Sequence, residues 1–266
     1  FKLNNKKNDF YNLINLVNKG CIDLDNELNL CTKFLKLDSR NCFVFVYFYF
    51  FATLIVKCNV YQKIKCIKVH CWDYRRFIVE KANVPLTKEL NYTTQLLTKD
   101  FSNGSAWHYR STLLAKIYSD DHSKMISKIV EELEFAWNAF YTEPDDQSTW
   151  LYHRWLLGKD GFTTMARLSD TSQKWVQSQI TGFHQLPLSV LIREYEKTQE
   201  LLSDEPNARW ALLTSAVLMR ALHQRGHVIV QASHRCTLIF DQLIQLDPMR
   251  KGYYNDIKHL MTKSLT

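Results

Sequence analysis

Apolar side chains recur three or four positions apart in five stretches of the chain, and each stretch ends in an acidic residue. The five stretches are residues 28–38, 90–100, 133–143, 195–205 and 238–247. This spacing places the apolar side chains on one stripe of a half-buried helix. Pro144, Pro206 and Pro248 directly follow three of the closing acids, and proline ends a helix because it lacks a backbone N–H and crowds the preceding turn. The pattern predicts about five helical hairpins.

A second pattern, a tryptophan followed two residues later by a tyrosine and then by a basic residue, occurs three times. The copies are residues 70–76 (HCWDYRR), 105–110 (SAWHYR) and 148–154 (STWLYHR). Trp72 and Trp107 lie 35 residues apart, and Trp107 and Trp150 lie 43 apart, close to the roughly 34 residues of a helix-turn-helix repeat plus a variable loop. The sequence therefore predicts an all-α, tetratricopeptide-like array of hairpins.

Residues 42–69 interrupt this period. The stretch opens with fifteen almost wholly apolar residues and continues with four lysines and no acid. A membrane span needs about 17 to 25 apolar residues, so this run is short for one, and a buried strand or helix would need partners that the repeat does not supply. The richness in Phe, Tyr, Ile, Lys and Asn favours a third interpretation, translated non-coding sequence from A/T-rich codons. A transcript that retains these codons at full abundance would contradict it.

The period also divides the rest of the chain. Residues 1–41 begin without a methionine in the middle of the pattern, so we expect a truncated N-terminal repeat there. Regular repeats follow over residues 70–158, an irregular Ser/Thr/Gln-rich insert over 159–187, and degenerate C-terminal repeats over 188–266.

Composition narrows the possible functions. The chain has 266 residues, 46% of them hydrophobic, with only 7 Gly and 5 Pro, which suits a cytoplasmic helical protein with a sizeable core. Its 7 cysteines are an odd number without paired metal spacing, which favours reduced thiols. The net charge of +7 arises mainly in the first 70 residues, so the repeats lack the basic stripe that nucleic-acid binding requires.

The residues reveal no complete catalytic constellation. His223 and His227 have the i, i+4 spacing of a possible metal pair, but Gly226 intervenes and no acidic residue lies between them, which favours a surface or capping pair. A phosphate-binding glycine loop and a Gly-x-Ser-x-Gly motif are also missing from the sequence. Without further comparison, the residues indicate a helical repeat scaffold that binds another protein.

Several blocks nevertheless resemble the α-subunit repeats of protein prenyltransferases, most closely the type II branch that includes Rab geranylgeranyltransferase. The blocks are residues 70–77 (HCWDYRRF), 103–110 (NGSAWHYR), 146–158 (DQSTWLYHRWLLG), 210–214 (WALLT), 218–222 (LMRAL) and 246–250 (LDPMR). The resemblance extends over roughly residues 24–41 and 70–260.

This resemblance implies a right-handed α-α superhelix of hairpins that wraps a separate β subunit. In the family, the β subunit carries the catalytic zinc and the isoprenoid cavity, and an escort protein presents the Rab GTPase. The reaction is attack of a zinc-bound Rab cysteine thiolate on geranylgeranyl diphosphate. This chain is accordingly expected to bind no cofactor and to be inactive alone. The α subunit of a farnesyl or type I geranylgeranyl transferase, and a tetratricopeptide-like adaptor, remain as alternatives.

Particular residues receive roles from the pattern and the resemblance. Four tryptophans are expected in the repeat core: Trp72, Trp107, Trp150 and Trp210. Because residues two apart point to different helix faces, the tyrosines and neighbouring basic residues are expected to face outward, where they either contact the β subunit or pack within the array. They are Tyr74, Arg75, Arg76, Tyr109, Arg110, Tyr152, His153 and Arg154. His70 matches a family histidine near the diphosphate, where a donor stabilises departing pyrophosphate.

Overall fold

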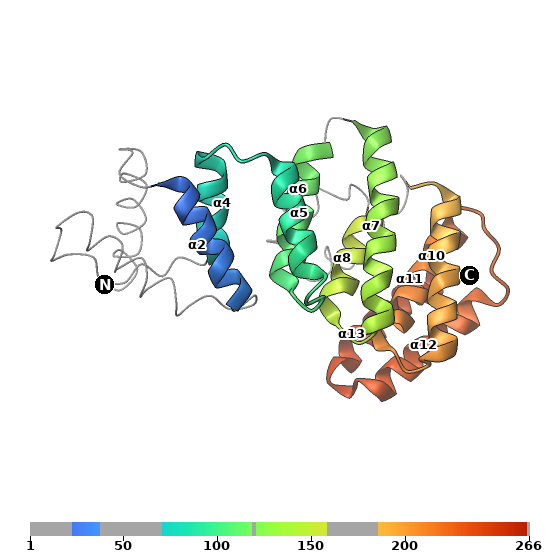
Figure 1. Ribbon diagram of the computed structural model, residues 1–266. Coiled ribbons are helices and arrows are strands. Elements are labelled where there is room, and N and C mark those ends of the chain that lie inside the picture. Colours follow the sequence, from blue (N-terminus) through green and yellow to red (C-terminus); the bar gives the residue numbers. More distant parts are fainter. Residues whose placement is uncertain (1–22, 38–70, 119–120, 159–185, 265–266) are drawn as a thin grey trace, which may run out of the picture. The chain divides into compact units, whose positions relative to one another are not determined.

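The computed structural model describes residues 23–37, 71–118, 121–158 and 186–264 (Figure 1). Within these ranges all regular structure is helical. The helices are α2 (Leu24–Leu37), α4 (Cys71–Lys81), α5 (Leu86–Leu97), α6 (Gly104–Tyr118), α7 (His122–Thr142), α8 (Gln147–Leu157), α10 (Leu188–Asp204), α11 (Arg209–Gln224), α12 (Ala232–Leu246), the 3₁₀ turn η3 (Pro248–Arg250) and α13 (Lys251–Ser264). The predicted all-α class is confirmed.

Each apolar run with a closing acid forms the first helix of a hairpin, as predicted. The hairpins are α2/α4, α7/α8, α10/α11 and α12/α13, together with α5/α6, whose helices are joined by side-chain hydrogen bonds. The chain separates into two compact units, with the boundary between Leu113 and Leu114 inside α6. The first unit contains α2, α4, α5 and most of α6, and the second contains α7 to α13. The insertion at 42–69, His70 and most of the irregular segment 159–187 lie outside the described residues.

The closing acids mark helix ends in the structure. Glu143, Glu205 and Asp247 are the C-terminal caps of α7, α10 and α12, respectively. The proline after each cap cannot continue the backbone hydrogen bonding of the helix. The sequence therefore predicts where these first helices stop.

The second helices begin at capping side chains. Asp146 caps α8 by accepting a hydrogen bond from the Ser148 backbone N–H (2.6 Å), and Asn103 accepts one from Ala106 N–H at the start of α6 (3.1 Å). These bonds satisfy backbone donors that lack a partner inside the helix. They hold the tryptophan of each motif in the first turn of its helix.

The core of the second unit is aromatic. Phe140 and Trp150 stack with 3.6 Å between ring centres, and the edge of Trp137 meets the Trp150 ring at 6.3 Å. Leu213 and Cys236 extend the same core toward α11 and α12. In the part of the chain that the structure describes, no helix combines the length and apolar character needed to cross a membrane.

Candidate functional site

The four motif tryptophans are buried. Trp72 is 9% exposed, Trp107 2%, Trp150 0% and Trp210 7%. Trp107 and Trp150 each donate a 2.7 Å hydrogen bond from Nε1 to the backbone carbonyl six residues earlier, on Phe101 and Pro144. The indole thus fills the interior of its hairpin and also fastens the loop that precedes the second helix.

The tyrosines and most of the neighbouring basic residues do not face outward, which corrects the expectation from the sequence. The buried members of this set are Tyr74, Arg75, Tyr109, Arg110, Tyr152 and His153. Burial is possible because each tyrosine hydroxyl donates to a buried glutamate on the first helix of its hairpin. The pairs and oxygen–oxygen distances are Tyr74–Glu27 (2.9 Å), Tyr109–Glu89 (3.2 Å) and Tyr152–Glu132 (2.7 Å).

These glutamates occupy one position of the repeat. Each lies eleven residues before the closing acid of its helix. We call the set the register glutamates: Glu27, Glu89, Glu132 and Glu194. They are at most 7% exposed, although a buried carboxylate is costly unless it is paired. Sequence reasoning missed them because they interrupt the apolar stripe, but their constant distance from the closing acid was a detectable signal.

In the first unit, Glu89 joins two hairpins. Arg75, on α4, donates to it through two parallel bonds, Nε to Oε2 (2.7 Å) and Nη2 to Oε1 (2.6 Å), while Tyr109 donates from α6. The guanidinium also lies 3.6 Å from the centre of the Tyr92 ring. Burial opposes the charged form of Arg75, but the bond to Glu89 and its charge raise the pKa of the arginine overall.

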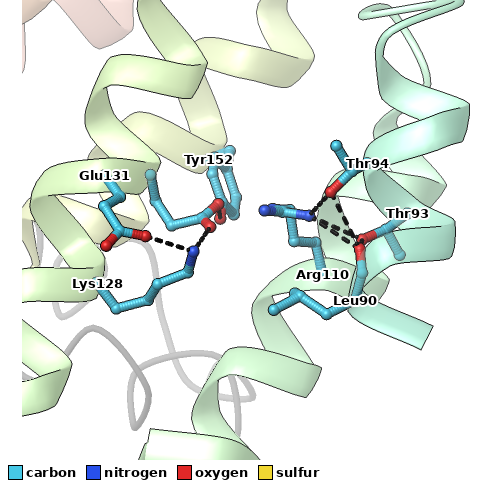
Figure 2. A network of polar contacts seen from close by, with 8 residues as sticks. Leu90, Thr93, Thr94, Arg110, Lys128, Glu131 and Tyr152 are labelled. Carbon is cyan, nitrogen blue, oxygen red and sulfur yellow. Dashed lines mark hydrogen bonds and ion pairs between the residues drawn. The ribbon is translucent and has the colours of Figure 1, made fainter. Parts of the chain in front are cut away.

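Arg110 links α6 to α5 in a different way (Figure 2). Its Nη1 atom donates to the Leu90 carbonyl oxygen (3.2 Å) and to the hydroxyls of Thr93 (3.0 Å) and Thr94 (2.8 Å). Leu90 lies in the interior of α5, and the hydroxyls of Thr93 and Thr94 also donate to its carbonyl oxygen (2.7 and 3.2 Å), so the guanidinium joins a cluster of polar groups on that helix. The residue stabilises the α5/α6 hairpin.

In the second unit, Glu132 accepts the Tyr152 hydroxyl within the α7/α8 hairpin, and Lys128 lies 3.3 Å from its other oxygen. Lys128 also donates to Glu131 at 2.8 Å (Figure 2). Partial burial alone would lower the pKa of Lys128, but the bond to Glu131 and the charge of Glu132 raise it overall. Glu132 is therefore charge-paired as well as hydrogen-bonded.

The side chains that contact the Glu194 carboxylate, on α10, come from the preceding hairpin α7/α8 and not from its own hairpin. Trp137 Nε1 donates to Oε2 at 2.7 Å, and His153 Nε2 lies 2.9 Å from the same oxygen. His153 occupies the place in the motif that Arg75 holds in the first copy. Burial alone would raise the pKa of Glu194, but the bonds from His153 and Trp137 lower it overall.

The contact between the fourth and fifth hairpins, α11 against α12, lacks this polar arrangement. Cys236 occupies the register position, eleven residues before Asp247, and Leu213 stands three residues after Trp210, where the earlier copies carry Arg75, Arg110 and His153. Cys236 and Leu213 lie in the same apolar cluster, 0% and 1% exposed. The acceptor and its basic partner have both been replaced by apolar groups, which avoids an unpaired buried charge.

The remaining predicted residues have separate surroundings. Arg76 forms a surface ion pair with Asp73, and Arg154 lies over the ring of Trp210. His223 is exposed in the last turn of α11. The helix ends at Gln224, so His227 does not share its face. Among the described residues no group of three or more His, Cys, Asp and Glu side chains could hold a metal ion.

Chemically, these contacts favour a scaffold over a catalytic centre. The buried carboxylates contact tyrosine, arginine, lysine, histidine and tryptophan side chains of the same array, as expected for groups that hold its helices together. The role of the motif residues at a partner interface, and the catalytic role of His70, stay predictions.

Comparison with known proteins identifies the repeat. Residues 86–117 and 129–160, which contain most of α5/α6 and α7/α8, match the protein prenyltransferase alpha subunit repeat. A Homo sapiens protein named geranylgeranyl transferase type-2 subunit alpha is 41% identical over 138 residues, which is 50% of this chain and 20% of that protein. These matches confirm the resemblance inferred from the sequence blocks.

Two proteins of the same name share a longer region with the chain. The Schizosaccharomyces pombe protein is 34% identical over 203 residues, covering 71% of this chain and 56% of that protein. The Dictyostelium discoideum protein is 32% identical over 238 residues, covering 89% of this chain and 59% of that protein. The chain thus spans a fifth of the length of the human relative and somewhat over half of the other two.

Proposed function

We propose that this chain, which carries protein prenyltransferase α-subunit repeats, acts as the α subunit of a type-2 geranylgeranyl transferase. The observation that carries the proposal is the similarity to type-2 α subunits over 203 and 238 residues. These similarities extend over 71% and 89% of the chain, far more than the two matched repeats at residues 86–117 and 129–160. The specific blocks favour this branch over a farnesyl or type I α subunit.

The proposed reaction joins a geranylgeranyl group from geranylgeranyl diphosphate to C-terminal cysteines of Rab GTPases presented by an escort protein. Zinc in the β subunit would activate the cysteine thiol. This chain would contribute a rigid array that holds the β subunit and would not be active alone. Support for that division comes from the fully engaged register glutamates, which suit a structural role. We place the heterodimer in the cytoplasm.

His70 is the residue of this chain that we propose for the diphosphate end of the site. Its support is the family resemblance of residues 70–77, and it directly precedes α4, whose tryptophan and arginine are buried. A hydrogen-bond donor at that point would stabilise the charge that develops on departing pyrophosphate.

Co-expression with a type-2 β subunit tests the function. We expect a stable complex that contains zinc and transfers geranylgeranyl to escorted Rab but not to a peptide ending in a CaaX motif. Transfer to the CaaX peptide instead would favour the farnesyl or type I alternative. A folded chain that binds no prenyltransferase β subunit would contradict the proposal and favour an adaptor.

A further inference from the structure

Two valines project from the loop between α11 and α12, which spans residues 225–231 (Figure 1). Val228 is 84% exposed and Val230 is 76% exposed, whereas Ile229 between them packs against the apolar core of the second unit. Ile229 therefore anchors the loop while its two neighbours point outward. Single exposed apolar side chains are normal on protein surfaces, so the two valines acquire meaning only from their surroundings.

The backbone fixes the loop in this form. Gly226 (φ +79°) and Gln231 (φ +54°) both adopt the left-handed conformation, one directly after α11 and the other directly before α12. Gly226 N–H donates to the His223 carbonyl oxygen at 3.0 Å, and Ala232 N–H donates to the Ile229 carbonyl oxygen at 3.2 Å. The loop is thus tied to both helices, and the exposure of the valines follows from its conformation.

The chain around the loop is positively charged. Residues 206–240 contain four arginines and no aspartate or glutamate. The arginines nearest to the valines in sequence are Arg225, which donates to the Leu186 carbonyl oxygen, and Arg235, which donates to Gln199 Oε1 at 3.0 Å. Both acceptors are uncharged, so these bonds position the guanidinium groups without neutralising them.

Neighbouring helix ends add to this positive field. Helix α12 begins at Ala232, directly after the loop, and a helix N-terminus carries a partial positive charge. Residues 186–192, which Arg225 contacts at Leu186, contain no acid either. The loop therefore presents two projecting apolar side chains within a positively charged part of the chain.

We propose that this loop, residues 225–231, binds the surface of a phospholipid bilayer that carries anionic headgroups. Val228 and Val230 enter the boundary between headgroups and acyl chains, while Arg225 and Arg235 attract the anionic headgroups. A bilayer fits better than an acidic protein, because a fluid bilayer accepts projecting side chains without a shaped pocket. The contact is peripheral and reversible, since two valines bury less apolar area than one acyl chain. It does not require the proposed transfer reaction.

Hydrogen–deuterium exchange of the full chain tests the contact at the loop itself. The chain is mixed with vesicles of phosphatidylcholine alone, or of equal parts phosphatidylcholine and phosphatidylserine. We expect the anionic vesicles to slow exchange of the backbone amides of residues 226–231, the neutral vesicles to have little effect, and added salt to reverse the slowing by screening the charges. Unchanged exchange in the loop would overturn the inference, even if the chain binds vesicles through another segment such as residues 42–69.

The double variant Val228→Ser/Val230→Ser tests the role of the valines. We expect it to need about tenfold more anionic lipid for the same slowing of exchange, with an unchanged melting temperature because both side chains are exposed. Met249→Ser is a matched control, since Met249 is 96% exposed but lies beyond the other end of α12, close in sequence to Asp247. It should behave as the unmodified chain does. An equal lipid requirement for the double variant and the unmodified chain would overturn the inference.

Poly-L-glutamate separates a bilayer from an acidic protein as the partner. It offers carboxylates without an apolar phase, so we expect it to slow exchange in the loop much less than anionic vesicles of equal total charge. Slowing as strong as that caused by the vesicles would favour an acidic protein and overturn the assignment to a bilayer.

Discussion

Replacement of Glu89 by glutamine is the sharpest test of how the hairpins are held together. The substitution keeps the size of the side chain but removes the charge that Arg75 binds through two hydrogen bonds. The side chains of this ion pair are 3% and 2% exposed. Arg75 would then carry a buried charge with no carboxylate to balance it.

The expected cost follows from burial. Removal of one member of a buried ion pair lowers the free energy of unfolding by about 3 to 5 kcal/mol. The neighbouring pair of Arg76 and Asp73 is a matched control, because its side chains are 38% and 49% exposed. Breaking an exposed pair costs about 0 to 1 kcal/mol. Glu89→Gln should therefore be the more damaging substitution by about 3 kcal/mol.

Urea unfolding, followed by circular dichroism and tryptophan fluorescence, measures the difference. With a slope of about 1 to 3 kcal/mol per molar urea, Glu89→Gln should lower the midpoint by about 1 M or more, whereas Asp73→Asn should barely move it. The double variant Arg75→Met/Glu89→Leu should recover much of the loss, since a well-packed apolar pair avoids the unpaired charge. Equal effects of Glu89→Gln and Asp73→Asn would refute the reasoning.

Four further outcomes are expected. Tyr152→Phe leaves Glu132 without its 2.7 Å hydroxyl donor and should lower the free energy of unfolding by about 1 kcal/mol in urea titrations; no loss would contradict the buried bond. The pKa of the Glu194 carboxyl is depressed below 4.5, so its contribution to stability is present above pH 4.5 and is lost as the pH falls through the lowered pKa. Glu194→Gln should therefore make the free energy of unfolding less dependent on pH in this acidic range, and an unchanged pH dependence would argue against the pairing. Cys236 is buried, and burial raises the pKa of its thiol to about 11. Iodoacetamide at neutral pH should therefore leave it unlabelled in the folded chain and label it after urea is added, as measured by peptide mapping. Rapid labelling of the folded chain would show that the thiol is accessible. His70→Ala should reduce turnover by the reconstituted heterodimer without loss of assembly, and unchanged turnover would remove the catalytic assignment.

The core residues of the candidate site were predictable, whereas most of its polar contacts were not. Trp107 and Trp150 stand out by their spacing, because a large apolar side chain repeated at the period of a hairpin is buried in each copy. The expectation that Tyr109 and Arg75 face outward failed for a physical reason. Their polar atoms reach Glu89 on another helix, and local spacing carries no information about that acceptor.

Local sequence determined the elements and their limits. Apolar spacing, the closing acids and Pro144, Pro206 and Pro248 act within one or two helical turns, so hairpin positions could be derived without knowledge of the neighbours. Pairing between helices was decided by the tertiary structure. Whether a buried charge is tolerated depends on donors brought from distant segments, as in the contact of His153 with Glu194 across 41 residues. Burial makes these interactions strong, and only the folded chain establishes which groups are buried together.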